Sequence, residues 1–441
     1  MRRDLQNVTA YAAGESLWGL QSYAVSSVTF LPLLLKNYGA GNTEIGVQSA
    51  LEVMTGLTSI IGLYLLYSRR RLKRQLMLWH VLVAIPFLVV AGVVNLNCLK
   101  VPLALRRWGL IACWTGHMWS VFAVITVWTD WASNLFETRI RGRAFAIALE
   151  GMCLAGMVGT VSVGWLLARY PGDTDVFSYV YFAAALVAGL SILTYSLWVR
   201  DDKADLAEEF PRPPKFAQIY LKFRQSLAEP NFRRFLVGRI LAGAGLGAIQ
   251  LVPAYYRSQA GGMLSDSSIL IYAMALPLSE AVGALALGAM GDHNGHRLGV
   301  IVGTAFQVAT VGVLLFSGGA VSCILAYAGM GVVFGGTWVS HINVVIESCP
   351  HEHRAAHITV SSLVLALPAA LAAVAYGWMA EVFGFRVVFA IWLVFSMAAL
   401  VWLVLRVKEP RMLSIYRSQR GRMMAGIISP EISADRRGRF S

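Results

Sequence analysis

The stretch GAMGDHNGHR, residues 288–297, separates two long hydrophobic segments of the chain. Within this short stretch lie three glycines, one aspartate, two histidines and one arginine. Similar apolar segments recur along the chain, and roughly 20 mostly apolar residues suffice to cross the hydrocarbon layer of a bilayer. We therefore interpret the stretch as a polar turn between two membrane-spanning segments.

The composition agrees with a membrane protein. Of the 441 residues, 57% are hydrophobic and 14% are charged, and the mean hydropathy is +0.61, whereas a soluble domain contains about 25% charged residues. The apolar segments predict about twelve spans. These spans must be helices, because a helix satisfies its own backbone hydrogen bonds in lipid. The expected spans are 14–36, 44–67, 76–97, 108–135, 144–169, 177–199, 235–257, 267–290, 298–317, 320–346, 357–381 and 387–407. The predicted fold class is an all-α polytopic membrane protein.

The positive charge is distributed unevenly between the two sides of the predicted membrane. With the N-terminus in the cytoplasm, 29 of the 37 Lys and Arg residues fall on the cytoplasmic side, 7 fall on the other side, and Arg239 lies within a span. This asymmetry follows the positive-inside rule, so we expect both termini in the cytoplasm and the chain in the cytoplasmic (inner) membrane. The net charge of +13 then reflects topology and contact with anionic lipid of the bilayer, and we expect no nucleic-acid partner.

The chain divides into two halves. A polar, proline-containing segment over 200–234 predicts a cytoplasmic linker with a short helix on the membrane surface. Aligning Arg141 with Arg354 matches a span end, a polar turn and the next helix in both halves, and such internal repeats are typical of secondary transporters. The expected organisation is a six-helix bundle over 1–199, the linker over 200–234, a second six-helix bundle over 235–408 and a basic cytoplasmic tail over 409–441.

The opening stretch resembles the signature loop of the major facilitator superfamily. The matching positions are Gly288, Asp292, His293, Gly295, His296 and Arg297. The segment RGRA, which contains Arg141, Gly142 and Arg143, resembles the second cytoplasmic loop of that family, and RVKEPR at 406–411 resembles a common ending of its last helix. The resemblance implies twelve helices in two pseudo-symmetric bundles and a monomer. It also implies that the signature loop is a latch on the cytoplasmic side, with Asp292 at a helix end where it can pair across the bundle, and that Arg141, Gly142, Arg143 and Arg354 take part in gating.

The chain departs from the family pattern in two places. The equivalent first-half loop, GLYLLYSRRRLKR at 62–74, has Leu66 where the pattern has aspartate. This departure keeps open a non-transporting receptor or scaffold as an alternative. The fifth span lacks the glycine-proline motif of many drug/proton antiporters, which disfavours that class, although an exporter of a lipophilic compound remains an alternative.

Ionisable residues within spans are the main functional candidates, because charge is costly in a membrane and tends to be functional or paired. Glu52 and Glu280 lie near the middle of their spans and could bind and release a proton; the alternative is a structural hydrogen bond to a neighbouring helix. Arg239 among several carboxylates predicts a salt-bridged inner gate, with a static structural network as the alternative. The proposed gate residues are Glu15, Asp130, Glu150, Arg239 and His341, and His117 and Gln250 are further polar candidates.

The resemblance implies that spans 1, 4, 7 and 10 line a central cavity, and aromatic residues on these helices could form the walls of a substrate site. Trp18, Trp119 and Trp338 lie on these helices, and aromatic walls suit sugars, apolar ligands or organic cations. The alternative for each tryptophan is packing or anchoring at the membrane interface.

No other chemistry is predicted. The segment CPHEHRAAH at 349–357 contains metal-binding residue types but no standard zinc spacing, so we interpret it as a basic loop and expect no metal and no cofactor. No nucleophile–base pair is recognisable, which argues against an enzyme and leaves no catalytic residues to name. The sequence therefore predicts a secondary active transporter of a small solute that is coupled to protons, as a symporter or an antiporter.

Overall fold

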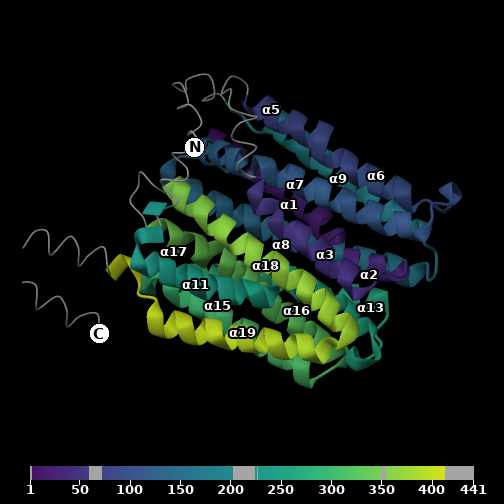
Figure 1. The fold of residues 1–441 in the computed structure, drawn as a ribbon. Coiled ribbons are helices and arrows are strands. Elements are labelled where there is room, and N and C mark those ends of the chain that lie inside the picture. Colours follow the sequence, from purple (N-terminus) through teal and green to yellow (C-terminus); the bar gives the residue numbers. More distant parts are fainter. Residues whose placement is uncertain (1, 59–71, 202–223, 226, 349–353, 413–441) are drawn as a thin grey trace, which may run out of the picture.

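The computed structural model describes residues 2–58, 72–201, 224–225, 227–348 and 354–412. These residues form helices joined by short turns, and they contain no strand (Figure 1). The predicted all-α polytopic fold is therefore confirmed. The first-half loop over 62–71, most of the linker, the loop over 349–353 and the tail beyond 412 lie outside the described residues, as do the side chains of Arg354 and His357. The surface helix and the domain boundaries stay predictions.

The helices fall into two groups along the chain. The N-terminal bundle consists of α1 (Arg2–Ala24), α2 (Phe30–Asn37), α3 (Asn42–Val53), η1 (Met54–Leu57), α5 (Leu72–Trp79), η2 (His80–Ala84), α6 (Ile85–Asn95), α7 (Leu103–Leu135), α8 (Thr138–Arg169) and α9 (Asp175–Trp198). The C-terminal bundle consists of α11 (Pro230–Leu246), η4 (Ile249–Leu251), α12 (Val252–Arg257), α13 (Asp266–Ala273), α14 (Ala275–Asn294), α15 (His296–Phe316), α16 (Gly319–Gly336), η6 (Thr337–His341), α17 (Ile342–Glu347), α18 (Arg354–Val382) and α19 (Phe385–Arg406).

Ten helical segments of the described chain are long and apolar enough to cross a membrane. The two further expected spans differ from these ten for separate reasons. The span predicted over 14–36 is divided between α1 and α2, and the span predicted over 44–67 is described only as far as residue 58. The total of twelve therefore stays a prediction.

Two spans are broken in the same way. In the first, α1 ends at Ala24 and α2 begins at Phe30; in the seventh, α11 ends at Leu246 and α12 begins at Val252. The short helix that follows each break, α2 or α12, contains a proline in its first turn, Pro32 or Pro253. The missing N–H costs no helical hydrogen bond at that position. The break therefore recurs at the same place in both halves, as expected for an internal repeat.

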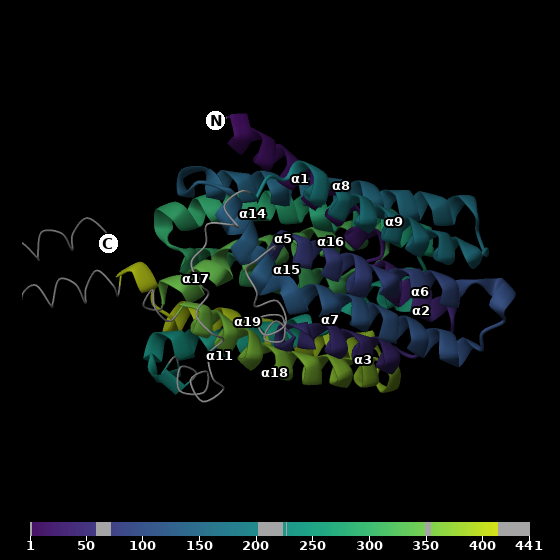
Figure 2. The same cartoon turned by 90° about the horizontal axis from the view of Figure 1, so that it is seen from above.

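The two ends of the bundles differ in their contacts. The start of α1 and the end of α19 lie at one end, here called the terminal face, whereas α2 and α13 lie at the other, here called the opposite face (Figure 1 and Figure 2). At the opposite face α3 packs directly on α18. A Cβ added to Gly46 would lie 2.5 Å from the carbonyl oxygen of Ala373, and one added to Gly377 would lie 2.6 Å from that of Asn42. Only glycine allows the two backbones to approach this closely.

Hydrogen bonds across the bundles also gather at the opposite face. Thr43 donates from its hydroxyl (2.7 Å) and its backbone N–H (3.0 Å) to Glu381, and Asn37 donates to Asp266 (2.7 Å). Further hydrogen bonds between the bundles lie at this face, from Arg257 to the carbonyl oxygen of Leu33 (3.5 Å), and around mid-depth, from Tyr23 to Glu280 and from Gln250 to Glu52. The structure is therefore closed at the opposite face.

The signature stretch is helical rather than a loop. Helix α14 continues to Asn294 and α15 begins at His296, so that Gly295 alone forms the turn, with a φ of +89° that favours glycine. Asp292 was expected to pair across the bundle, and this prediction is wrong for the structure. Its side chain is 78% exposed and lies 3.9 Å from His296, one turn along the chain, so its partner within the described residues belongs to the same bundle.

The segments that resemble two family patterns contact each other. Glu409 accepts a hydrogen bond from the backbone N–H of Arg297 (3.0 Å). Arg411 donates to the carbonyl oxygens of Gly291 (3.1 Å) and Asp292 (3.0 Å) and forms an ion pair with Glu347 (2.7 Å). All these partners belong to the C-terminal bundle, so this network stabilises one bundle internally at the terminal face.

Candidate functional site

The carboxylate of Glu52 accepts hydrogen bonds from four side chains. Ser27 donates at 2.7 Å, Gln48 and Gln250 at 3.0 Å each, and Trp114 at 3.1 Å. Gln250 comes from the C-terminal bundle, whereas the other donors come from the N-terminal bundle. Glu52 is therefore the acceptor at the centre of a polar cluster that joins the two bundles.

The helix breaks bring two of these donors to Glu52. Ser27 lies in the break between α1 and α2, and Gln250 lies in η4, within the break between α11 and α12. Both side chains are buried, at 3% and 4% exposure. Broken helices that meet at a polar cluster are typical of binding sites in transporters. The repeated break is therefore the feature that builds this part of the site.

Glu280 makes a second polar contact between the bundles. It lies on α14, is 3% exposed, and accepts a hydrogen bond from the Tyr23 hydroxyl at 2.7 Å. Tyr23 ends α1 beside the helix break, and its hydroxyl also lies 4.0 Å from the sulfur of Cys153. The two carboxyls predicted near mid-span thus both hydrogen-bond to the other bundle.

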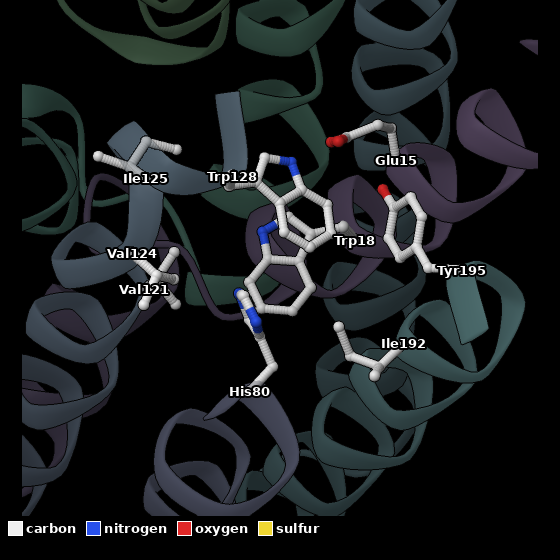
Figure 3. Close-up of a pocket in the computed structure, with 9 residues that line it drawn as sticks. All are labelled: Glu15, Trp18, His80, Val121, Val124, Ile125, Trp128, Ile192 and Tyr195. Atoms are coloured by element: carbon white, nitrogen blue, oxygen red, sulfur yellow. The ribbon is translucent and has the colours of Figure 1, made fainter. Parts of the chain in front are cut away.

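A pocket of about 80 Å³ lies inside the N-terminal bundle (Figure 3). Trp18, His80, Trp128 and Tyr195 form its aromatic wall, with ring centroids 5.5 Å apart for Trp18 and His80 and 4.9 Å apart for Trp128 and Tyr195. The carboxyl of Glu15 points toward Trp128 and Tyr195 (Figure 3). Aromatic faces beside a carboxylate are suited to a cationic or apolar group, and the volume admits a small part of a ligand.

A second pocket lies at the related place in the C-terminal bundle, between α11, α15 and α16–η6. It is lined by Arg239, Thr337 and His341. Arg239 is 8% exposed, and its one hydrogen bond goes to the Thr337 hydroxyl at 3.5 Å. The predicted salt-bridged gate is therefore wrong for this structure: no carboxylate of the described chain pairs with Arg239, because Glu15 lies in the pocket of the other bundle.

The remaining candidates connect helices of one bundle, are partly exposed, or form no ion pair among the described residues. His117 is buried and hydrogen-bonds the Ala84 carbonyl oxygen (2.9 Å), and Trp119 donates to that of Leu51 (2.8 Å), so both connect helices of the N-terminal bundle. Trp338 is 50% exposed. The side chains of Asp130, Glu150, Arg141 and Arg143 form no ion pair within the described part of the chain. Gly142 lies beside these arginines in the first two turns of α8.

Sequence reasoning missed four partners of the central carboxyls. Tyr23, Ser27, Gln48 and Trp114 donate to Glu280 or Glu52. The run of hydroxyl residues in YAVSSVTF (23–30) could have indicated the break in the first span, since serine and threonine compete with backbone hydrogen bonds. No signal in the sequence indicates which helix Trp114 faces.

We expect Glu52→Ala to destabilise the protein by about 3 kcal/mol or more, because it leaves several buried donors without an acceptor. Glu52→Gln retains one acceptor oxygen and should cost less. The measurement is thermal or denaturant unfolding of the full chain in detergent, with the exposed Glu137→Ala as control. Equal stability of Glu52→Ala and Glu137→Ala would contradict the assigned hydrogen-bond cluster.

Comparison with known proteins finds a match to one family model and similarity to several solved structures. The family model of the Major Facilitator Superfamily matches residues 262–422. A mutant of the nucleoside transporter NupG superposes with a TM-score of 0.67, covering 92% of this chain and 100% of that chain at 11% identity. A POT family transporter in complex with a thioalcohol-conjugated peptide gives a TM-score of 0.66, covering 93% of this chain and 96% of that chain at 12% identity. At such identities these structures show a shared fold.

Proposed function

We propose that this chain, an integral membrane protein, belongs to the Major Facilitator Superfamily, whose model matches residues 262–422, and is a proton-coupled secondary active transporter of a small solute. It would work by alternating access, with the two bundles exposing the site to one side of the membrane and then to the other. The terminal face would be cytoplasmic, because 29 of the 37 Lys and Arg residues fall on that side of the predicted topology. In that orientation the structure is closed toward the outside.

One observation supports proton coupling above the others. The two carboxyls predicted near mid-span each accept a hydrogen bond from the opposite bundle, Glu280 from Tyr23 and Glu52 from Gln250. Protonation of either carboxyl changes its capacity as an acceptor and therefore the free energy of the contact between the bundles. A proton bound at this interface would shift the equilibrium between the open and closed arrangements.

The test is transport by the full chain in proteoliposomes that contain a pH-sensitive dye. Sugars, nucleosides, amino acids, carboxylates and lipophilic cations are added singly, with and without an imposed pH gradient. We expect one class to move protons together with solute, above the level of protein-free liposomes. Solute movement without proton movement would contradict the coupling, and no movement of any class would favour the receptor or scaffold.

A further inference from the structure

The guanidinium of Arg239 has no counter-charge in the described chain. Its side chain is 8% exposed, its Nε has no hydrogen-bond partner, and its contact with Thr337, at 3.5 Å, is long. The Thr337 hydroxyl already donates to the Val333 carbonyl oxygen (2.8 Å). A buried charge that lacks a partner is costly, and more so within a membrane, so the site requires a compensating group.

Four acidic residues in the described part of the same bundle are engaged elsewhere. Glu347 pairs with Arg411, Glu409 accepts from Arg297, and Glu280 accepts from Tyr23. Asp266 pairs with Arg257 at the opposite face. The compensating anion therefore does not come from these side chains.

The pocket beside Arg239 has room for an atom-sized group. Its volume is about 10 Å³, which is about the space that one water molecule needs. Gly299, Gly303 and Gly336 line it, and a Cβ added at Gly303 would meet no atom within 4 Å, so the space beside this glycine is open. Besides Nε of Arg239, the ring nitrogen Nδ1 of His341 is also buried there without a hydrogen-bond partner. The pocket thus combines a fixed positive charge with an unused polar atom and a small space.

We propose that this pocket binds an anionic group, with Arg239 as its counter-charge and the Nδ1 atom of His341 as a second polar contact. The space admits one atom, which is either a free halide ion or one oxygen of a planar carboxylate on the transported solute, and it does not admit a whole tetrahedral oxyanion such as sulfate in this conformation. This inference deepens the proposed function by naming an anion as ligand or co-ion. Because binding is measured in detergent without transport, its failure would leave proton coupling untouched.

The test follows the thermal stability of the full chain in detergent and zwitterionic buffer, during titration with sodium chloride, sodium formate or sodium sulfate at matched ionic strength. Wild type should gain about 3–5 °C on saturation with chloride or formate and little with sulfate. Stabilisation by chloride assigns a free anion, whereas stabilisation by formate alone assigns a solute carboxylate. Arg139→Gln, which changes an exposed arginine on α8, should respond like wild type.

Arg239→Gln removes the charge and should abolish the response to both anions. Without added anions it should be at least as stable as wild type, because it removes an uncompensated buried charge. Thr337→Val keeps the arginine but removes its hydroxyl contact, so it should weaken the response to both anions. This variant replaces Arg239→Gln in the test if Arg239→Gln does not fold. An equal response to chloride and formate in wild type and both variants, or no response in wild type, would overturn the proposal.

Discussion

Glu280→Gln is expected to abolish accumulation of solute driven by a pH gradient while it preserves exchange of solute across the membrane. Glutamine cannot bind and release a proton, but its carbonyl oxygen can still accept the hydrogen bond that Tyr23 donates at 2.7 Å. A gradient of one pH unit concentrates a solute about tenfold when one proton moves with it, and the variant should not concentrate it at all. The measurement is uptake and counterflow in proteoliposomes.

Two further variants identify the cause of that loss. Tyr23→Phe removes the hydroxyl and keeps the carboxyl, so it should retain proton coupling with altered rates. Glu137→Gln changes an exposed carboxyl next to the start of α8 and should behave like wild type. Accumulation by Glu280→Gln at the level of the wild type would exclude Glu280 as the proton site.

Gly46→Val is expected to reduce the rate of transport by about one to two orders of magnitude. Its side chain would collide with the α18 backbone around Ala373 and Gly377, so α3 could not approach α18 and the opposite face could not close. The cost falls on the closed state, on the order of 1–3 kcal/mol as for other overpacked contacts, and alternating access requires that state. Folding should survive, because the bundles can pack separately.

Labelling of an engineered cysteine can measure this separation directly. Ala50 packs against Ala370 and Ala373 of α18 and is 8% exposed. Ala50→Cys therefore reports on the closed contact in a chain that also has Cys98→Ser and Cys349→Ser. A water-soluble maleimide should label it slowly with Gly46 and rapidly with Gly46→Val. Gly189→Val is the matched control, because a Cβ at Gly189 meets no atom within 4 Å. Slow labelling and normal transport by Gly46→Val would show that the contact is not required.

The sequence predicts how deep a residue lies in the membrane better than it predicts which neighbouring helix its side chain faces. Apolar length locates the spans, and the mid-span positions of Glu52 and Glu280 are apparent from it. Their partners are not, because Tyr23 and Glu280 lie 257 residues apart and a single sequence does not indicate which helices adjoin. The predicted gate failed for the same reason. Glu15 and Arg239 were expected at similar depth, but they face separate pockets in separate bundles.

The polar turn at 288–297 shows a complementary limit. Its glycine and charged residues predicted a loop, yet nine of the ten positions are helical, because a single glycine with positive φ suffices to reverse the chain. Its contacts with Glu409 and Arg411 come from a segment more than a hundred residues later. The motif therefore predicted an ordered turn, but the residues that contact this turn could be identified only from the structure.

The paired helix breaks have a consequence for the route by which the interface can separate. At each break the backbone leaves the helical hydrogen-bond ladder within the apolar layer, and this is tolerated where the backbone is enclosed by protein or meets water. In the closed structure protein encloses both breaks, and Ser27 and Gln250 turn their side chains to Glu52. Once the bundles part, these groups need another hydrogen-bonding medium, and lipid tails offer none. The seam between the breaks can therefore open only as it hydrates, so that wetting and opening are a single event.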